Sequence, residues 1–182
     1  MNRVAASLAP RDTDDALRDL DRLASRIGLA EIRLDLMRTF DVEKLVASSP
    51  VPLIVTCRPE RERGGFTGPE AERLAILRSA YDRGCAYIDV EDDILADVAG
   101  WDGGPARIIA SRHWFDRMPS DLLDTYEALR DRCAEAAGDG RYEPYKLSLK
   151  FDNPQARLPH GFPLDPTQKE VQEMLFKEAG GP

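Results

Sequence analysis

Short runs of β-branched and other apolar residues alternate along the chain with longer stretches whose apolar residues recur at helical spacing. The pattern predicts six strands and five helices. The strands are expected at residues 3–8, 30–36, 53–58, 86–91, 107–113 and 145–150, and the helices at 14–27, 42–48, 69–83, 121–136 and 167–179. Because helix-length connections between successive strands are typical of parallel pairing, the chain is expected to adopt an α/β fold.

Five of the predicted strands place polar residues at every second position. These residues are Glu31, Arg33 and Asp35; Thr56 and Arg58; Asp89 and Glu91; Ser111 and His113; and Lys146, Ser148 and Lys150. A strand between two helical layers is normally apolar on both faces, whereas strands of a (β/α)8 TIM-type barrel can direct polar side chains into a common mouth. An antiparallel sheet with one wet face would show the same stripes, but the helix-length connections argue against it. The first strand is not followed by the Gly-x-Gly-x-x-Gly signature of a dinucleotide-binding sheet, so the barrel is favoured.

Glycine and proline mark the expected ends of the elements. Gly28, Gly84 and Gly138 each follow an amphipathic stretch, where a left-handed residue would end a helix. Residues 151–166 contain four prolines and are expected to form a loop. The segment after the fourth strand is short and weakly patterned. Length favours a single domain over residues 1–182.

Composition and charge narrow the range of partners and cellular compartments to be expected. The net charge of −8 and the pI near 4.9 disfavour nucleic acid and anionic membrane as partners. The sequence has no run of 18 apolar residues and no signal-type stretch at its start. Its three cysteines are an odd number without metal-ligand spacing, which suits a reducing compartment. A cytoplasmic protein without a metal site is expected.

Two residues have the chemistry of an acid/base and a nucleophile. An imidazole at the strand-end position of His113 can act as a general base near neutral pH, although a lone histidine there is more often a hydrogen-bonding surface residue. Lys146 begins a strand of alternating polarity, and desolvation inside a barrel would make its amine a nucleophile. A solvated lysine on an edge strand is the simpler alternative.

Two arginines on polar faces have the planar fork that suits a carboxylate or several hydroxyls. Arg33 and Arg58 lie on neighbouring strands, and buried pairing with Glu31, Asp35 or Asp89 is an equally good interpretation. Residues 58–68 then form a charged, glycine-rich loop at the end of the barrel where function is expected. This loop lacks the lysine-serine/threonine ending of a phosphate-binding loop.

Five collinear segments resemble type I 3-dehydroquinate dehydratase, the Schiff-base-forming (β/α)8 lyase of the shikimate pathway of aromatic amino acid biosynthesis. The segments are 4–8, 31–35, 52–58 with the loop to residue 68, 87–91, and the run Ser-Arg-His-Trp-Phe-Asp at 111–116 followed by Pro119. The resemblance implies that the chain dehydrates 3-dehydroquinate to 3-dehydroshikimate without metal or organic cofactor. A class I aldolase, another lysine-imine barrel, fits the architecture but not the loop.

The resemblance also implies roles for individual residues. His113 would be the general acid/base and Glu62 the carboxylate that orients it. Lys146 would be the Schiff-base lysine, with Lys150 on the same face as its rival. The substrate-binding residues would be Glu31, Arg33 and Arg58, with Ser7 nearby.

The end of the chain departs from the family pattern. A complete barrel of this type has eight strands and about 200 residues or more, whereas the sequence predicts about six βα units and lacks strands seven and eight. An open barrel edge favours association, so a partner or a second copy in a homo-oligomer is expected to cover it. The alternative function is a catalytically incomplete barrel that binds a ligand or partner without turnover.

Overall fold

The computed structural model describes residues 5–101, 104–115 and 120–137. Within them, strands and helices alternate as predicted. The elements are β1 (Ala5–Leu8), α1 (Thr13–Leu23), β2 (Leu29–Arg33), η1 (Leu34–Leu36), α2 (Val42–Ser48), β3 (Leu53–Thr56), η2 (Glu60–Glu62), α3 (Glu70–Asp82), β4 (Tyr87–Glu91), η3 (Asp92–Ile94), α4 (Leu95–Val98), β5 (Arg107–Ser111) and α5 (Leu122–Ala137). The predicted strand 145–150, loop 151–166 and helix 167–179 lie outside the described residues.

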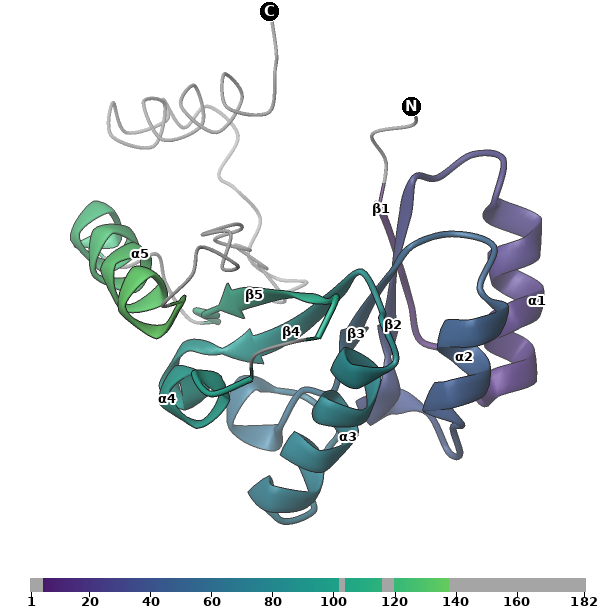
Figure 1. The fold of residues 1–182 in the computed structure, drawn as a ribbon, viewed down its shortest axis with the longest axis horizontal. Coiled ribbons are helices and arrows are strands. Elements are labelled where there is room, and N and C mark those ends of the chain that lie inside the picture. The colour runs from purple at the N-terminus through teal and green to yellow at the C-terminus, as the bar shows by residue number, and fades with distance from the viewer. Residues whose placement is uncertain (1–4, 102–103, 116–119, 138–182) are drawn as a thin grey trace, which may run out of the picture.

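The five strands form one sheet in the order β1-β2-β3-β4-β5, and every neighbouring pair is parallel. Helices α1 to α4 lie along one side of this curved sheet (Figure 1). Sequential parallel strands with helices on the outside are the arrangement of a (β/α) barrel wall. The predicted parallel α/β architecture is confirmed.

Strand register divides the sheet into an apolar outer face and a polar inner face. Ile32 pairs with Val55, and Val55 pairs with Ile88, so these side chains form one buried row on the outer face. Leu20 of α1, Leu45 of α2 and other helical residues pack against that row in a single core. The inner face consists of the alternate residues, among them Glu31, Arg33, Thr56 and Asp89 of the predicted polar stripes.

Local signals explain why the first helices begin where they do. Asp12 is the N-cap of α1, and its carboxylate accepts a hydrogen bond of 2.9 Å from the Asp15 backbone N–H. Asp41 caps α2 in the same way through Lys44 N at 2.9 Å. A side-chain acceptor at this position satisfies a backbone donor that the helix leaves unpaired. Both caps stabilise the helices that cover β1 and β2.

Several predicted boundaries are wrong by a few residues. The second strand does not reach residue 36: it ends at Arg33, and η1 then turns Asp35 out of the strand toward the loop after β3. Similarly, β3 ends at Thr56 and β5 at Ser111, so Arg58 and His113 lie in the segments after these strands. The weakly patterned segment after β4 contains the short helix α4, whose Leu95 and Val98 are buried.

The glycines predicted to end helices differ in backbone conformation. Gly84 adopts the left-handed conformation, with φ of 84°, directly after the C-cap of α3. Gly28 does not adopt positive φ, because α1 ends at Leu23 and the Leu23 carbonyl accepts hydrogen bonds from Arg26 and Ile27. Gly138 lies outside the described residues.

Candidate active site

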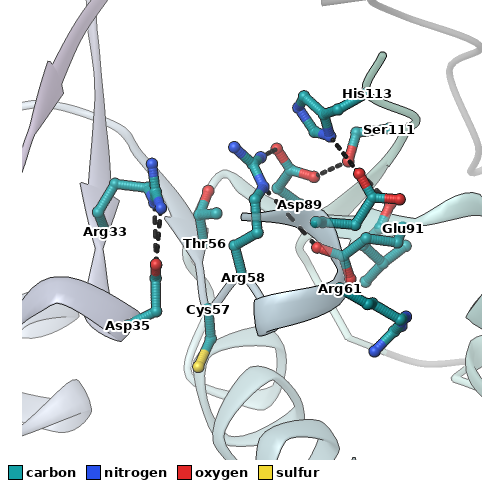
Figure 2. Close-up of polar contacts among 12 residues, drawn as sticks. Arg33, Asp35, Thr56, Cys57, Arg58, Arg61, Asp89, Glu91, Ser111 and His113 are labelled. Atoms are coloured by element: carbon teal, nitrogen blue, oxygen red, sulfur yellow. Dashed lines mark hydrogen bonds and ion pairs between the residues drawn. The ribbon is translucent and has the colours of Figure 1, made fainter. Parts of the chain in front are cut away.

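The predicted polar residues of the described chain meet at the inner face of the sheet. Figure 2 shows Arg33, Thr56, Arg58, Asp89, Ser111 and His113 grouped at the ends of β2 to β5. Ser7, Glu31 and Glu62 join this group through hydrogen bonds to its neighbouring members. The carboxyl end of parallel strands is where barrel enzymes build their sites. The predicted Lys146 and its rival Lys150 lie outside the described residues.

Glu31 links three strands at one side of the site. Its two carboxylate oxygens accept hydrogen bonds from the Ser7 hydroxyl of β1, at 2.5 Å, and from the Thr56 hydroxyl of β3, at 2.8 Å. The sheet register causes this contact, since Ser7 pairs with Glu31 and Arg33 pairs with Thr56. Glu31 is therefore held as a hydrogen-bond acceptor by hydroxyls on both neighbouring strands.

Arg33 and Asp35 form a closed pair beside Glu31. Arg33 Nε and Nη2 donate to the two oxygens of Asp35 at 2.9 and 2.6 Å. The Asp35 side chain has 0% exposure and also accepts from the Gly65 backbone N–H at 2.9 Å. Burial by itself would raise the pKa of Asp35, but the hydrogen bonds from Arg33 and Gly65 outweigh it and lower the pKa below its ordinary value.

The loop after β3 folds back on itself to reach this pair. Phe66 N–H donates to the Arg58 carbonyl at 3.1 Å, and Glu60 N–H donates to the Phe66 carbonyl at 3.2 Å. Gly64 and Gly65 are needed here because a Cβ would lie 2.0 Å from the Arg58 carbonyl oxygen and 2.4 Å from that of Asp35, respectively. The glycine-rich character of residues 58–68 therefore serves close backbone packing.

The folded loop presents Glu62 to His113. Their side chains meet with 3.2 Å between His113 Nδ1 and Glu62 Oε2. The imidazole has 1% side-chain exposure and stacks on Phe115 with ring centroids 6.0 Å apart. A proton on Nδ1 would be shared with Glu62, leaving the Nε2 lone pair to accept a proton. His113 Nε2 is buried and has no hydrogen-bond partner among the described residues.

Arg58 lies between two carboxylates of β4. Its Nη2 donates to Asp89 Oδ2 at 3.1 Å, while its Nε is 3.9 Å from Glu91 Oε1 (Figure 2). Asp89 also accepts from the Ser111 hydroxyl at 2.5 Å. Burial raises the pKa of Asp89, and burial also raises the pKa of Glu91 to about 7. The two carboxylates therefore bind protons more readily than exposed ones.

One residue of this network was not predicted. Arg73 of α3 has 0% exposure and lies 2.7 Å from Glu91 Oε2 through its Nη1. Charged residues on a predicted helix are usually solvated, so the pattern gave no reason to place Arg73 inside. Its one sequence signal is Glu70, three residues earlier, with which it pairs on the same helix face.

Two further features are absent from the described residues. No group of three or more histidine, cysteine, aspartate or glutamate side chains is arranged to hold a metal ion there. Within the same ranges, no helix has the length and apolar character needed to cross a membrane.

Comparison with known proteins identifies the family. The sequence model of the type I 3-dehydroquinase family matches residues 4–137. The chain belongs to this family. A 3-dehydroquinate dehydratase from Syntrophobacter fumaroxidans is 34% identical over 126 residues, which cover 64% of this chain and 53% of that protein. The chloroplastic bifunctional 3-dehydroquinate dehydratase/shikimate dehydrogenase of Arabidopsis thaliana is 36% identical over 119 residues, covering 61% of this chain and 19% of that protein.

Solved structures of the type I 3-dehydroquinase family support the fold. The 3-dehydroquinate dehydratase from Geobacillus kaustophilus superimposes with a TM-score of 0.61 at 23% identity, covering 73% of this chain and 57% of the other. The predicted TIM-barrel fold class is thereby confirmed for the part of the barrel that the structure describes. The chain matches about half the length of the Syntrophobacter and Geobacillus dehydratases.

Proposed function

We propose that the chain is a 3-dehydroquinate dehydratase that removes water from 3-dehydroquinate to give 3-dehydroshikimate. The observation that carries this proposal is the His113–Glu62 pair, whose buried Nε2 has no hydrogen-bond partner among the described residues, beside Arg58 and Asp89 (Figure 2). Membership of the type I 3-dehydroquinase family and relatives that bear this enzyme's name support it. An oriented imidazole with a free basic nitrogen is what proton abstraction next to a ketone requires.

In the proposed mechanism the amine of Lys146 adds to the ketone of the substrate and expels water to form an iminium ion. The iminium acidifies the adjacent carbon by accepting its electron pair. His113 Nε2 takes a proton from that carbon, and the resulting enamine expels the neighbouring hydroxyl, to which the imidazolium returns the proton. Hydrolysis of the imine then releases the enone product and restores Lys146.

The remaining residues would bind the substrate. Arg58 and Arg33 offer guanidinium donors to its carboxylate and hydroxyls, and Glu31 and Ser7 offer an acceptor and a hydroxyl at the neighbouring strands. Glu62 would hold His113 in the tautomer whose lone pair is on Nε2 and stabilise the imidazolium once it forms. The proposal assigns the covalent step to lysine and the proton transfers to histidine.

Borohydride trapping tests the covalent step. The chain is incubated with 3-dehydroquinate and borohydride, digested, and analysed by mass spectrometry beside a sample without substrate. A reduced adduct on Lys146 is expected; an adduct on Lys150 would move the imine to that residue. If neither lysine is modified, the Schiff-base mechanism is wrong for this chain.

A parallel assay separates turnover from binding. Formation of the conjugated enone is followed by its ultraviolet absorbance, and light scattering on the same sample reports the oligomeric state. Enone formation is the expected result. Ligand binding by calorimetry without enone formation would instead identify the chain as a catalytically incomplete barrel, a possibility raised by its match to only 53% of the Syntrophobacter enzyme.

A further inference from the structure

Arg73 is a buried charge on the outer side of the sheet. It belongs to α3, whose Leu77 and Ala80 pack in the apolar core, and its own charged side chain is buried beside them with 0% exposure. A guanidinium in such a place is unfavourable unless its charge and its donors are matched by partners. The partners of Arg73 therefore show what the residue does.

The guanidinium of Arg73 connects three elements. Nε and Nη2 donate to Glu70 on its own helix, at 3.0 and 2.5 Å. Nη1 donates to the backbone carbonyl of Cys57 at 2.8 Å, just past the end of β3. The same nitrogen is 2.7 Å from Glu91 Oε2 at the end of β4. This contact is an ion pair, because the angles between the two groups do not fit a hydrogen bond.

Both groups that Nη1 contacts across the sheet adjoin Arg58. Cys57 is the residue before Arg58, so its carbonyl belongs to the peptide that sets the direction of the Arg58 side chain. Glu91 turns its other oxygen, Oε1, toward Arg58 Nε across 3.9 Å. Arg58 Nε and Glu91 Oε1 are both buried and make no hydrogen bond with any described residue, so a movement of about 1 Å would join them.

We propose that Arg73 is a positioning residue for Arg58, which it holds through the backbone at Cys57 and through the carboxylate of Glu91. The role rests on the proposed function, in which Arg58 binds the substrate. Arg73 itself belongs to α3, on the outer side of the sheet, and its side chain has 0% exposure. Because the Arg58 donors must meet substrate atoms within hydrogen-bond distance, loss of either support is expected to weaken binding.

The charges around Glu91 support this connection. Burial raises the pKa of Glu91 to about 7, and Arg73 is the largest influence that opposes the rise; Asp89 adds to it and Arg58 opposes it. Removing Arg73 would therefore raise the pKa of Glu91 further and neutralise the carboxylate near neutral pH. A neutral Glu91 attracts the Arg58 guanidinium less strongly.

The direct test observes Arg58 without any ligand. In the 15N-labelled chain, the Arg58 Nε–Hε signal is assigned by its loss in Arg58→Lys and then recorded in Arg73→Met and Glu91→Gln. The matched control is Arg78→Met, which removes an exposed arginine of α3 that pairs with Asp82. We expect the signal to shift in the first two variants and to stay in place in the control.

An unchanged Arg58 signal in Glu91→Gln and in folded Arg73→Met would overturn the proposal. Circular dichroism shows whether each variant folds, and the nearly isosteric Glu91→Gln decides the result if Arg73→Met does not. This readout needs no turnover, so it remains decisive even if the chain proves not to be a dehydratase.

Kinetics then connect the position of Arg58 to binding. Arg73→Met is expected to raise KM for 3-dehydroquinate about 10-fold or more, with a smaller change in kcat, because misplacement of a binding group by about 1 Å costs up to about 100-fold. Arg73→Lys keeps the charge and should recover part of the loss. In a chain that already carries Arg58→Lys, Arg73→Met should raise KM by a smaller factor, since the two substitutions affect the same interaction with the substrate. Full additivity of the two changes would contradict the proposed route.

Discussion

The two arginines of the site are held in different ways. Arg33 makes a two-point contact with Asp35, two residues away in sequence, and the Asp35 carboxylate is completed by the Gly65 N–H. Arg58 faces two carboxylates of β4 but makes a single hydrogen bond to them, at 3.1 Å to Asp89. The pKa of Asp35 is lowered, whereas burial raises the pKa values of Asp89 and Glu91.

The difference shows where a ligand has most to gain. In the Arg33–Asp35 pair the Asp35 carboxylate has its hydrogen bonds from Arg33 and from the Gly65 N–H before a ligand arrives, and it fixes the loop against β2. Around Arg58, by contrast, buried side-chain atoms lack hydrogen bonds: within the described residues these atoms belong to Arg58, Glu91 and His113, and those of Glu91 have only ion-pair contacts. Leaving buried polar atoms without partners costs free energy, which a hydroxylated, anionic ligand can recover. We infer that the Arg58 side is where the substrate is recognised most strongly.

The largest effect is expected at His113. Its replacement in His113→Gln should lower kcat about 1,000-fold, within the range for a general acid/base, because the side-chain amide has no basic nitrogen. Enone formation measures the loss. Arg112→Gln is the control, since this neighbouring residue is exposed and pairs with Asp92. Retention of activity within tenfold in His113→Gln would show that the unpartnered Nε2 is not the base.

Breaking the Arg33–Asp35 pair should lower the free energy of unfolding more than breaking the Arg58–Asp89 pair. Arg33→Met leaves the Asp35 carboxylate buried without its main partner, and a loss of about 3 to 5 kcal/mol in the free energy of unfolding is expected. Arg58→Met should cost less at pH 5, because Glu91, whose pKa is about 7, takes up a proton at that pH, and burial also raises the pKa of Asp89. Urea unfolding of both variants at pH 5 measures the difference; equal losses would remove the distinction between the pairs.

Glu91 should make the chain less stable as the pH rises. Its pKa is about 7 in the folded state against 4.5 as the ordinary value, so the folded state binds the proton more tightly. The stabilisation is therefore complete below pH 4.5 and is lost as the pH rises through about 7, with a size of about 3 kcal/mol at most. Urea unfolding between pH 5 and pH 8 should show this loss in the parent chain. Glu91→Gln has no proton to release and should lack it; identical pH profiles would contradict the assignment.

The smallest effect is expected at Arg61. This residue precedes Glu62 and pairs with Asp93 and Glu70, but its side chain is 39% exposed. Exposed ion pairs contribute little, so Arg61→Gln should lower the free energy of unfolding by less than about 1 kcal/mol and change kcat only a few-fold. A loss as large as that of Arg33→Met would show that the number of ion pairs, not their burial, sets the cost.

The pattern of the sequence predicted most of the described elements but not all of their ends. The alternation of apolar runs and helical stretches located β1 to β5 and their parallel connections, because strand and helix periods differ clearly. The alternation predicts that the second strand continues past Arg33, since Leu34-Asp35-Leu36 keeps the same pattern. In the structure the Asp35 carboxylate accepts from Arg33 and from Gly65, and η1 replaces the strand. Gly65 is 30 residues away from Asp35, so no local pattern contains this competition.

By itself, the sequence determined which side chains would share the inner face. Alternation places Glu31 with Arg33 and Asp89 with Glu91, since successive residues of a strand point to opposite sides. Only the tertiary structure decided which charged groups are paired, which buried ones lack a hydrogen bond, and which bind protons near neutral pH. Those properties depend on burial and on partners from other elements: Asp89 for Arg58, Glu62 for His113, and Arg73 for Glu91. Desolvation and the distance between charges exist only after the strands and α3 have packed together.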